Sequence, residues 1–504
     1  MVNGETYRYG DLHARARAVA AAIRDVDDGG SPLGAICAER SLAAYVGILG
    51  TLLAGRGYVP LNPSFPPERT RAMLERSGAR TAVADDPGLE ALAGVVRDEA
   101  ALTVIAPDAA GPPSWAAGSP HRVVCAHELG PATGDAAPAA GPEAIAYLLF
   151  TSGTTGTPKG IGIRQRNVGA YLAAIAERYD LGPGDRCSQN FALTFDLSVH
   201  DLFVSWGAGA CVCVPPARTA MAPGRFVADQ ALTSWFSTPS TAAMMLKMRM
   251  LRPGTFPALR WSLFCGEALT VDVADAWRAA APGALLDNLY GPTEATIACT
   301  AYRYDGANGG GDFANGVVPI GRPFGTTRAA VVDGSMQPVG PGEAGELLLG
   351  GGQLAGGYWG DPERTGRAFV SVPALEPDGP WYRTGDLASL GPRDELVYRG
   401  RIDDQIKIRG HRVELQEVES VVRAASDASS VVALGWPRTA AGADGIIVFL
   451  SGGRAADEAV LGGCRRALPE YMVPREVHRI EAMPLNPSGK VDRRRLLETR
   501  EAMG

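Results

Sequence analysis

The sequence lacks the features that would place the chain in a membrane or on a polyanion. It contains no run of about 18 apolar residues, so no membrane-spanning helix is expected. Its N-terminal segment has no basic region followed by an apolar one, so no secretory signal is predicted. Lys and Arg number 48 against 55 Asp and Glu, a net charge of −7, with no long run of one sign. This balance argues against nucleic acid or an anionic membrane surface as a main partner.

Cysteine is present but not in a pattern that carries chemistry. The eight cysteines are scattered singly, apart from Cys211 and Cys213 in an apolar run. This spacing fits neither a zinc site nor a disulfide framework in a chain of this length. Buried free thiols in a reducing compartment are the expected state, and the sequence therefore predicts a cytoplasmic protein.

Glycine and proline, by contrast, are abundant. The 63 glycines and 37 prolines make up about a fifth of the 504 residues, which is below the roughly 25–30% typical of disordered chains. Hydrophobic residues contribute 46%, enough for buried cores. At roughly 150 residues per domain, the length predicts about three domains.

Short apolar runs alternate with helical patterns along much of the chain. Residues 7–26 have the apolar spacing of an amphipathic helix. The alternation indicates βαβ units and mostly parallel sheets. Residues 107–142 are rich in Ala, Gly and Pro and are expected to form a long surface connection. From residue 317 short strands and tight turns predict a smaller antiparallel or barrel-like unit, and the C-terminal stretch predicts a compact α+β domain.

The first segment with chemical character runs from residue 148 to residue 160. An apolar strand leads directly into a loop that holds five hydroxyl residues, three glycines and a lysine. Glycine lets the backbone approach an anion closely, and hydroxyl and amide groups donate hydrogen bonds to phosphate oxygens. The spacing of a Walker phosphate loop is absent. The segment therefore predicts an unconventional phosphate-binding loop, with a solvated turn as the alternative.

Three further segments carry candidate ligand groups. Residues 288–294 place an aromatic ring and the Glu294 carboxylate around a Gly-Pro turn. The ring can stack on a base, and the carboxylate can bind magnesium. Residues 381–386 and 398–403 supply a carboxylate suited to a ribose diol and an arginine suited to a phosphate or ribose oxygen. Residues 486–493 present a lysine on a turn. Each segment alone is also typical of an ordinary solvated loop.

In order and spacing, these segments resemble the core motifs of the adenylate-forming superfamily, and most closely those of the adenylation domains of nonribosomal peptide synthetases. The resemblance runs from about residue 5 to the end of the chain. Further segments that look like family motifs are residues 39–69, 195–201, 345–365 and 400–419. Since no carrier domain follows the last motif, we expect either a stand-alone enzyme that acts on its carrier in trans or a domain excised from a longer protein.

The patterning and the resemblance together predict an α/β fold in two unequal parts. Residues 1–401 are expected to form a large N-terminal core of two mixed or parallel sheets with helices. The third subdomain of this core, about residues 317–401, is expected to be β-rich and barrel-like. Residues 402–504 are expected to form a small, mobile α+β domain that carries the catalytic lysine, with Asp403 at the hinge.

The resemblance implies a two-step ligase reaction. The carboxylate of an α-amino acid attacks the α-phosphorus of ATP, which gives an aminoacyl adenylate and pyrophosphate, and a carrier thiol then displaces AMP. Because the first two reactants are both anions, catalysis rests on positioning and charge stabilisation. The implied catalytic residues are Thr151, Glu294, which would bind Mg²⁺, and Lys490, which would bridge the substrate carboxylate and the nucleotide.

The nucleotide site that the resemblance implies is built from several of these segments. Residues 151–156 would hold the β- and γ-phosphates, Asn288 and Tyr290 would contact adenine, and Asp386 would take the ribose hydroxyls. The implied nucleotide-binding residues are Ser152, Gly153, Thr154, Thr155, Gly156, Lys159, Asn288, Tyr290, Gly291, Thr293, Asp386, Tyr398 and Arg401.

Asp196 matches the family carboxylate that pairs with the α-amine of an amino acid. A buried aspartate without a partner is costly, so a cationic ligand accounts for it. The implied pocket residues are Asp196, Leu197, His200, Ser237, Leu263, Cys265, Gly266, Leu289, Ile297 and Ala298. These favour a neutral, small to medium side chain, with proline or an aliphatic residue foremost. Because His200 and Ser237 could bind a hydroxyl or thiol group, threonine, serine and cysteine are also candidate substrates. His200 is equally well explained as a packed residue of the pocket wall.

The implied ligands and partners are ATP with Mg²⁺, an α-amino acid and a phosphopantetheinylated carrier protein, with a small MbtH-like protein as a candidate helper. Two alternatives stay open. One is an acyl- or aryl-CoA ligase of the same superfamily, which the Asp196 match argues against. The other is a non-catalytic nucleotide-binding scaffold, which the retention of every motif acid and lysine argues against.

Overall fold

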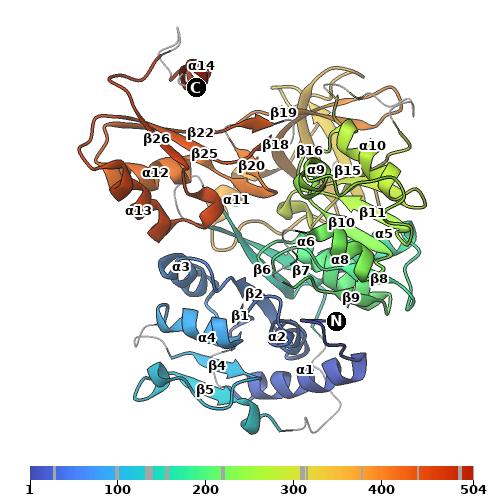
Figure 1. The fold of residues 1–504 in the computed structure, drawn as a ribbon, viewed down its shortest axis with the longest axis vertical. Helices are drawn as coiled ribbons and strands as arrows, with labels where there is room; N and C mark the ends of the chain where they lie inside the picture. The colour runs from blue at the N-terminus through green and yellow to red at the C-terminus, as the bar shows by residue number, and fades with distance from the viewer. Residues whose placement is uncertain are drawn as a thin grey trace.

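The computed structural model places two large sheets, a smaller antiparallel sheet and a C-terminal unit in one molecule (Figure 1). It describes residues 1–26, 30–96, 101–130, 140–153, 158–216, 219, 222–306, 313, 316–375, 379–403, 405–439, 442–485 and 491–502. Among these residues, none of the helices combines the length and the apolar character needed to cross a bilayer. In this view α1 and α4, in blue, lie toward the bottom, and α14, in red, lies at the top.

The first sheet has seven strands, of which all but the last run parallel. Three of its central strands are buried along their whole length, as expected for parallel strands covered on both faces. In spatial order the strands are β5 (Arg122–Cys125), β4 (Thr103–Ala106), β3 (Thr81–Ala84), β1 (Leu33–Cys37), β2 (Gly57–Leu61), β6 (Ile145–Thr151) and β7 (Lys159–Arg164).

The expectation that residues 107–142 form only a surface connection is wrong in one respect. Strand β5 lies within this stretch and pairs in parallel with β4 at the edge of the first sheet. Its last two residues, Val124 and Cys125, are buried. The Ala, Gly and Pro around this short apolar run obscure it in the sequence, whereas pairing with β4 stabilises it in the fold.

The second sheet also has seven strands, with an antiparallel edge on an otherwise parallel sheet. The largest hydrophobic cluster draws on residues of both large sheets, including Tyr58 and Phe236. The two sheets therefore share one core. In spatial order its strands are β14 (Arg322–Pro323), β13 (Thr300–Arg303), β12 (Leu285–Tyr290), β11 (Trp261–Phe264), β10 (Ser234–Ser237), β8 (Arg186–Ser188) and β9 (Cys211–Cys213).

Helices cover the two large sheets. The predicted amphipathic helix is α1, and Ala16, Val19 and Ile23 on one of its faces are buried. The other helices of this part are α2 (Leu42–Leu53), α3 (Pro67–Ser77), α4 (Asp86–Ala93), α5 (Gln165–Arg178), α6 (Leu197–Val199), α7 (Ser205–Gly207), α8 (Pro223–Asp229), α9 (Pro239–Lys247) and α10 (Val271–Ala280), while α1 itself spans Tyr9–Arg24.

The β-rich unit expected from residue 317 onward is a five-stranded sheet in which every paired strand is antiparallel. Helix α11 (Pro362–Ala368) leads into its short edge strand. The strands are β15 (Thr327–Val332), β16 (Gly345–Gly351), β17 (Phe369–Val370), β18 (Trp381–Leu390) and β19 (Leu396–Arg401).

The C-terminal stretch forms the predicted α+β arrangement, with two small sheets and three helices. One hydrophobic cluster of this part includes no residue before Ile406. The division of the chain at residue 401 stays a prediction. The elements are β20 (Ile406–Ile408), β21 (His411–Val413), α12 (Leu415–Ser426), β22 (Ser430–Gly435), β23 (Arg438–Thr439), β24 (Gly442–Ala443), β25 (Ile446–Ser451), α13 (Asp457–Ala467), β26 (Glu476–Arg479) and α14 (Arg493–Ala502).

Candidate active site

A cavity of about 120 Å³ lies where the two large sheets, strand β18 and the hairpin β20–β21 meet. Strands β6 and β12 each end at it, consistent with the rule that ligands bind beyond the carboxyl ends of parallel strands. Eleven of the predicted site residues line this cavity: Thr151, Ser152, Asp196, Leu197, Cys265, Gly266, Tyr290, Gly291, Thr293, Asp386 and Arg401. Segments far apart in the sequence are therefore brought together as predicted.

A second cavity of about 320 Å³ adjoins the first. Tyr290, Arg401 and Lys407 line both, and the predicted residue Tyr398 lines the second alone. Four predicted residues, Thr154, Thr155, Gly156 and Lys490, lie outside the described residues.

Asp196 is the most unusual carboxylate of the cavity. The residue is buried, and its Oδ2 atom has no hydrogen-bond partner among the described residues. Burial is the main cause that raises the pKa of Asp196 to about 6; a hydrogen bond from Thr293 lowers this pKa, and the nearby Glu294 charge raises it. Leaving a carboxylate oxygen buried and unpaired is costly, and a cationic group in the cavity would remove that cost.

Asp386 is held at the cavity wall by two donors. The hydroxyl of Tyr290 donates to Oδ2 at 2.5 Å, and Arg401 Nη1 donates to Oδ1 at 2.5 Å. Arg401 also makes a two-pronged ion pair with Asp403, at 2.6 and 2.7 Å. Because each carboxylate oxygen has two lone pairs, Asp386 is fixed in place and can still accept hydrogen bonds from a diol.

The start of the predicted phosphate-binding loop contacts the C-terminal part of the chain. Ser152 Oγ donates to the carbonyl oxygen of Arg412 at 2.8 Å, and the Gly153 N–H donates to Glu417 Oε2 at 3.2 Å. Within the described part of the chain, Thr151 Oγ1 is buried and has no partner. The loop thus offers an unused hydroxyl next to two donors that already bind protein acceptors.

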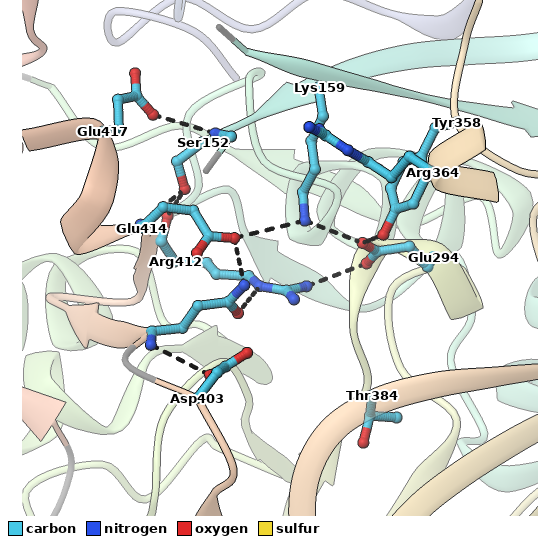
Figure 2. Close-up of polar contacts among 12 residues, drawn as sticks. Ser152, Lys159, Glu294, Tyr358, Arg364, Thr384, Asp403, Arg412, Glu414 and Glu417 are labelled. Atoms are coloured by element: carbon cyan, nitrogen blue, oxygen red, sulfur yellow. Dashed lines mark hydrogen bonds and ion pairs between the residues drawn. The ribbon is translucent and has the colours of Figure 1, made fainter. Parts of the chain in front are cut away.

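Glu294 is the centre of a buried network of charges (Figure 2). Arg412 Nη1 donates to Glu294 Oε2 at 3.2 Å, and the hydroxyl of Tyr358 donates to Oε1 at 2.9 Å. Lys159 Nζ lies 3.6 Å from the same Oε1 and 3.8 Å from Glu414 Oε1. Figure 2 shows the side chains of Lys159, Glu294 and Arg412 converging, and these residues belong to β7, to the short 3-10 helix after β12 and to β21.

Electrostatics set the ionisation of this network. Burial opposes the charge of Glu294, but Arg412 and Lys159 outweigh it and hold the pKa of the carboxyl at about 2. Burial lowers the pKa of Lys159 to about 8, helped by the Arg412 charge. Glu294 is therefore ionised at neutral pH and is neutralised by cations of the protein itself.

The predicted magnesium site does not fit this arrangement of the chain. Both oxygens of Glu294 already bind donors, and Arg412 contributes a positive charge where the ion would lie. No group of three or more His, Cys, Asp or Glu able to hold a metal occurs among the described residues. Any metal at Glu294 therefore requires Arg412 to be elsewhere.

Asn288 lies beside the two cavities without lining either of them. Its Nδ2 donates to the carbonyl oxygens of Pro319 at 2.9 Å and Val318 at 3.3 Å, so the amide nitrogen is engaged by the backbone. Its Oδ1 has no partner in the described ranges. A contact with adenine through this residue stays a prediction.

The remaining predicted pocket residues are buried behind the cavity wall: His200, Ser237, Leu263, Leu289, Ile297 and Ala298. His200 Nδ1 hydrogen-bonds the hydroxyl of Tyr171 at 2.6 Å, and burial lowers the pKa of the imidazole to about 3. Ser237 Oγ accepts from Trp235 Nε1 at 2.9 Å and donates to Thr238 O at 3.1 Å. Both polar groups already have protein partners, so neither is poised here to bind a substrate hydroxyl or thiol.

Two further candidates, Lys407 and Glu267, are not singled out by the sequence motifs. Lys407 is half-buried between the two cavities, and burial lowers the pKa of its amine. Glu267 accepts from the Ser240 N–H at 2.8 Å and from the Gly410 N–H, which fastens the hairpin β20–β21 to the core. For Lys407, the alternation of charged and apolar residues at 400–419 is the sequence signal that could have indicated it.

Known proteins resemble this chain over nearly its whole length. The family described as AMP-binding enzyme matches residues 1–359. Novobiocin biosynthesis protein H from Streptomyces niveus is 33% identical over 506 residues, which cover 98% of this chain and 78% of that protein. Tyrocidine synthase 2 from Brevibacillus parabrevis is 33% identical over 489 residues, and the match covers 96% of this chain but 13% of that protein.

A solved structure gives the corresponding similarity in three dimensions. The Vibrio cholerae adenylation domain AlmE, crystallised in complex with glycyl-adenosine-5'-phosphate, matches with a TM-score of 0.88 and 32% identity. The match covers 100% of this chain and 94% of that one. The α/β architecture described above, with its small C-terminal part, is thus that of an adenylation domain.

Proposed function

Because the chain belongs to the AMP-binding enzymes, we propose that it uses ATP to convert a neutral α-amino acid into an aminoacyl adenylate. One observation carries the choice of an amino acid. Asp196 places an unpaired, buried carboxylate oxygen in the same cavity as Asp386 and Tyr290. An α-ammonium group would pair with Asp196, while the ribose hydroxyls of the nucleotide would bind Asp386.

The first step joins two anions, and the chain supplies the compensating charge. A carboxylate oxygen of the substrate forms a bond to the α-phosphorus, the bond between the α-phosphorus and its bridging oxygen breaks, and pyrophosphate leaves. Lys490 would bridge the substrate carboxylate and the nucleotide oxygens, and Thr151 and the residues after it would hold the departing phosphates. Such fixed donors act by stabilising charge as it develops. Glu294 would hold magnesium only in an arrangement in which Arg412 has moved away.

The size of the substrate side chain follows from the cavity wall. Leu197, Cys265 and Gly266 line it, and these are apolar or small. The likeness to a domain crystallised with glycyl-adenosine-5'-phosphate supports a small side chain. Proline and small aliphatic amino acids are therefore the foremost candidates, while the hydrogen-bonded states of His200 and Ser237 lend no support to a hydroxyl or thiol substrate.

The second step would transfer the aminoacyl group to the phosphopantetheine thiol of a carrier protein in trans. The thiolate sulfur attacks the carbonyl carbon, a thioester forms and AMP leaves. An aromatic wall borders the cavity on the C-terminal side, where the ring of His411 stacks on Tyr471 at 3.6 Å and meets Phe195 at 4.4 Å between centroids. The flat faces of this wall suit a narrow pantetheine arm.

The proposed motion separates the two steps. Leu485 and Val491, which flank the segment containing Lys490, pair with each other and line neither cavity. The hairpin β20–β21 lies at the cavity instead. Residues 402–504 would therefore turn about Asp403 so that Lys490 serves adenylation and the hairpin serves transfer. A role for a small MbtH-like helper protein stays a prediction.

Amino-acid-dependent exchange of pyrophosphate into ATP tests the proposal. A panel of glycine, alanine, proline, valine, threonine and cysteine should identify at least one substrate, and Asp196→Asn should lower its kcat/KM by about 30-fold or more, the cost of leaving a buried charge unpaired. Activity with aryl or fatty acids alone would favour the CoA-ligase alternative. Transfer of the product to CoA rather than to a carrier protein would do the same.

A further inference from the structure

Seven of the eight cysteines are buried, as expected from the sequence, and Cys211 is the exception. It is half-buried on β9, the last strand of the second sheet. A cavity of about 70 Å³ lies beside it and is lined also by Tyr9, Leu12 and Trp206. Cys211 is therefore the cysteine of this chain that is most accessible to a small molecule.

A second thiol lies next to Cys211 on the same strand. Residues two apart on a strand share a face, and Cys213 Sγ lies 3.9 Å from Cys211 Sγ. Both side chains pack with the hydrophobic cluster that contains Phe226. A disulfide requires the two sulfurs to approach to about 2.05 Å. The pair is therefore close to bonding distance, and rotation of the side chains with a small contraction of β9 would close the gap.

The geometry of a strand makes such a bond reversible. Two residues of a strand span about 6.4–6.8 Å, which is the upper end of the roughly 4.4–6.8 Å found between the Cα atoms of a disulfide. A bond between Cys211 and Cys213 would be strained, and strained disulfides are easily reduced. The site therefore suits a labile disulfide rather than a permanent cross-link.

The contact between the two sulfurs gives the thiols different roles. The Cys213 thiol donates to Cys211 Sγ, and this hydrogen bond is the main cause that lowers the pKa of Cys211, while burial opposes it. The same hydrogen bond is the main cause that raises the pKa of Cys213. Because the thiolate and not the thiol is the nucleophile, Cys211 reacts first and Cys213 second.

We propose that Cys211 and Cys213 form a reversible modification site, at which a small-molecule disulfide oxidises the two thiols to an intrachain disulfide. The Cys211 thiolate attacks one sulfur of the small disulfide, whose S–S bond breaks, and a mixed disulfide forms. Cys213 then attacks Cys211 Sγ and expels the second small thiol. Two electrons pass from the protein to the small disulfide, and the two thiol protons leave on the released thiols. The first step also removes the negative charge beside Cys213, so its thiol ionises more easily for the second step.

Excess glutathione disulfide added to the full-length protein tests the proposal. Peptide mapping with cleavage between Cys187 and Cys211 should show that the peptide with both thiols loses two hydrogen atoms and regains them on reduction. Modification should be at least about tenfold faster than at the buried Cys464, since an exposed thiolate reacts and a buried thiol does not. A stable glutathione adduct without ring closure, equal rates at Cys464, or no modification of either thiol would overturn the proposal.

Two variants separate the roles of the thiols. Cys213→Ala should stop at a stable mixed disulfide on Cys211, and Cys211→Ala should leave Cys213 unmodified. Rapid modification of Cys213 in Cys211→Ala would contradict the proposed order of attack. Cys464→Ala is the matched control and should close the disulfide at the normal rate, because Cys464 lies on α13. The reaction needs neither ATP nor an amino acid, so its outcome is independent of the proposed function.

Amide hydrogen exchange on the unmodified protein tests the strand contraction without any variant. The Gln189 N–H, just after β8, donates to the carbonyl oxygen of Cys213 at 2.9 Å. The next two N–H groups donate to Asp201 Oδ2 at 2.8 and 3.2 Å. Contraction of β9 would weaken the first of these bonds, so the oxidised protein should exchange faster at residues 189–191 than the reduced protein. Unchanged exchange there would contradict the contraction on which ring closure depends.

Discussion

At the scale of single residues, the protonation of Asp196 governs amino-acid binding. Burial raises the pKa of this carboxyl to about 6. Above that pH the carboxylate is charged and attracts an α-ammonium group, while below it the neutral acid does not. We expect the KM for the amino acid to rise as pH falls below about 6, by up to about tenfold per pH unit. Pyrophosphate-exchange kinetics between pH 5 and pH 8 measure this.

The nucleotide supplies the control for this experiment. The KM for ATP should change little over the same range, because Asp196 does not contact the ribose site. Asp196→Asn should have a high KM for the amino acid at every pH, without the further rise below about pH 6. Parallel changes in the KM values for ATP and the amino acid would contradict the assigned role, and so would a rise below pH 6 that persists in Asp196→Asn.

Single residues also show how much of the candidate site could be predicted from the sequence. Asp196, Asp386 and Tyr290 were found from motif order and do line one cavity. The prediction that Ser237 faces the substrate finds no support, because its hydroxyl bonds the Trp235 indole two positions earlier in β10. Residues two apart on a strand share a face. The pairing could thus have been anticipated once residues 234–237 were assigned to a strand.

At the scale of secondary-structure elements, the contact between α1 and α2 depends on one glycine. A Cβ atom built at Gly50 of α2 would lie 2.6 Å from Val19 Cγ1 and 3.0 Å from the carbonyl oxygen of Ala16. We expect Gly50→Ala to destabilise the protein by about 1–3 kcal/mol through overpacking. Urea-induced unfolding measures the change.

Gly169 of α5 provides the matched control for the Gly50→Ala substitution. It is exposed, and a Cβ atom there would meet nothing within 4 Å. Gly169→Ala should raise the free energy of unfolding by about 0.5–1 kcal/mol, since alanine loses less backbone entropy in a helix. If both substitutions stabilised the protein, the close packing of α1 on α2 would be disproved.

The hairpin β20–β21 depends on Gly410 at its turn. Gly410 has φ of +84°, and a Cβ atom there would lie 2.5 Å from Thr238 Cγ2. We expect Gly410→Ala to slow transfer from a preformed adenylate to the carrier by about tenfold, the effect of roughly 1.4 kcal/mol, while pyrophosphate exchange persists. Single-turnover transfer and exchange assays separate these steps. Gly366→Ala in α11 is the control and should alter neither rate, because a Cβ atom built there meets no atom within 4 Å. Slowed exchange with normal transfer in Gly410→Ala would contradict the assignment of the hairpin to transfer.

At the scale of the whole molecule, the sequence predicted the parts better than their contacts. Alternating patterns, together with the family resemblance, predicted the two large sheets, the antiparallel unit and the small C-terminal part. They could not give the bond between Arg412 and Glu294, which are 118 positions apart, or that between Gly153 and Glu417, which are 264 apart. Such contacts depend on how two separately packed units dock, and local periodicity carries no information about docking.

At the same scale, the proposed turn of residues 402–504 leads to opposite expectations for Lys490 in the two half-reactions. We expect Lys490→Ala to lower amino-acid-dependent pyrophosphate exchange by at least about 100-fold, the usual effect of losing one charge-stabilising donor. Transfer from a synthetic aminoacyl adenylate should stay within about threefold of normal, because Arg412 faces Glu294 in the arrangement that we assign to transfer. Arg494→Ala on α14, a residue 90% exposed, controls for loss of a basic C-terminal side chain. Near-normal exchange in Lys490→Ala would show that adenylation does not need this lysine. It would also remove the reason for proposing that residues 402–504 turn between the two steps.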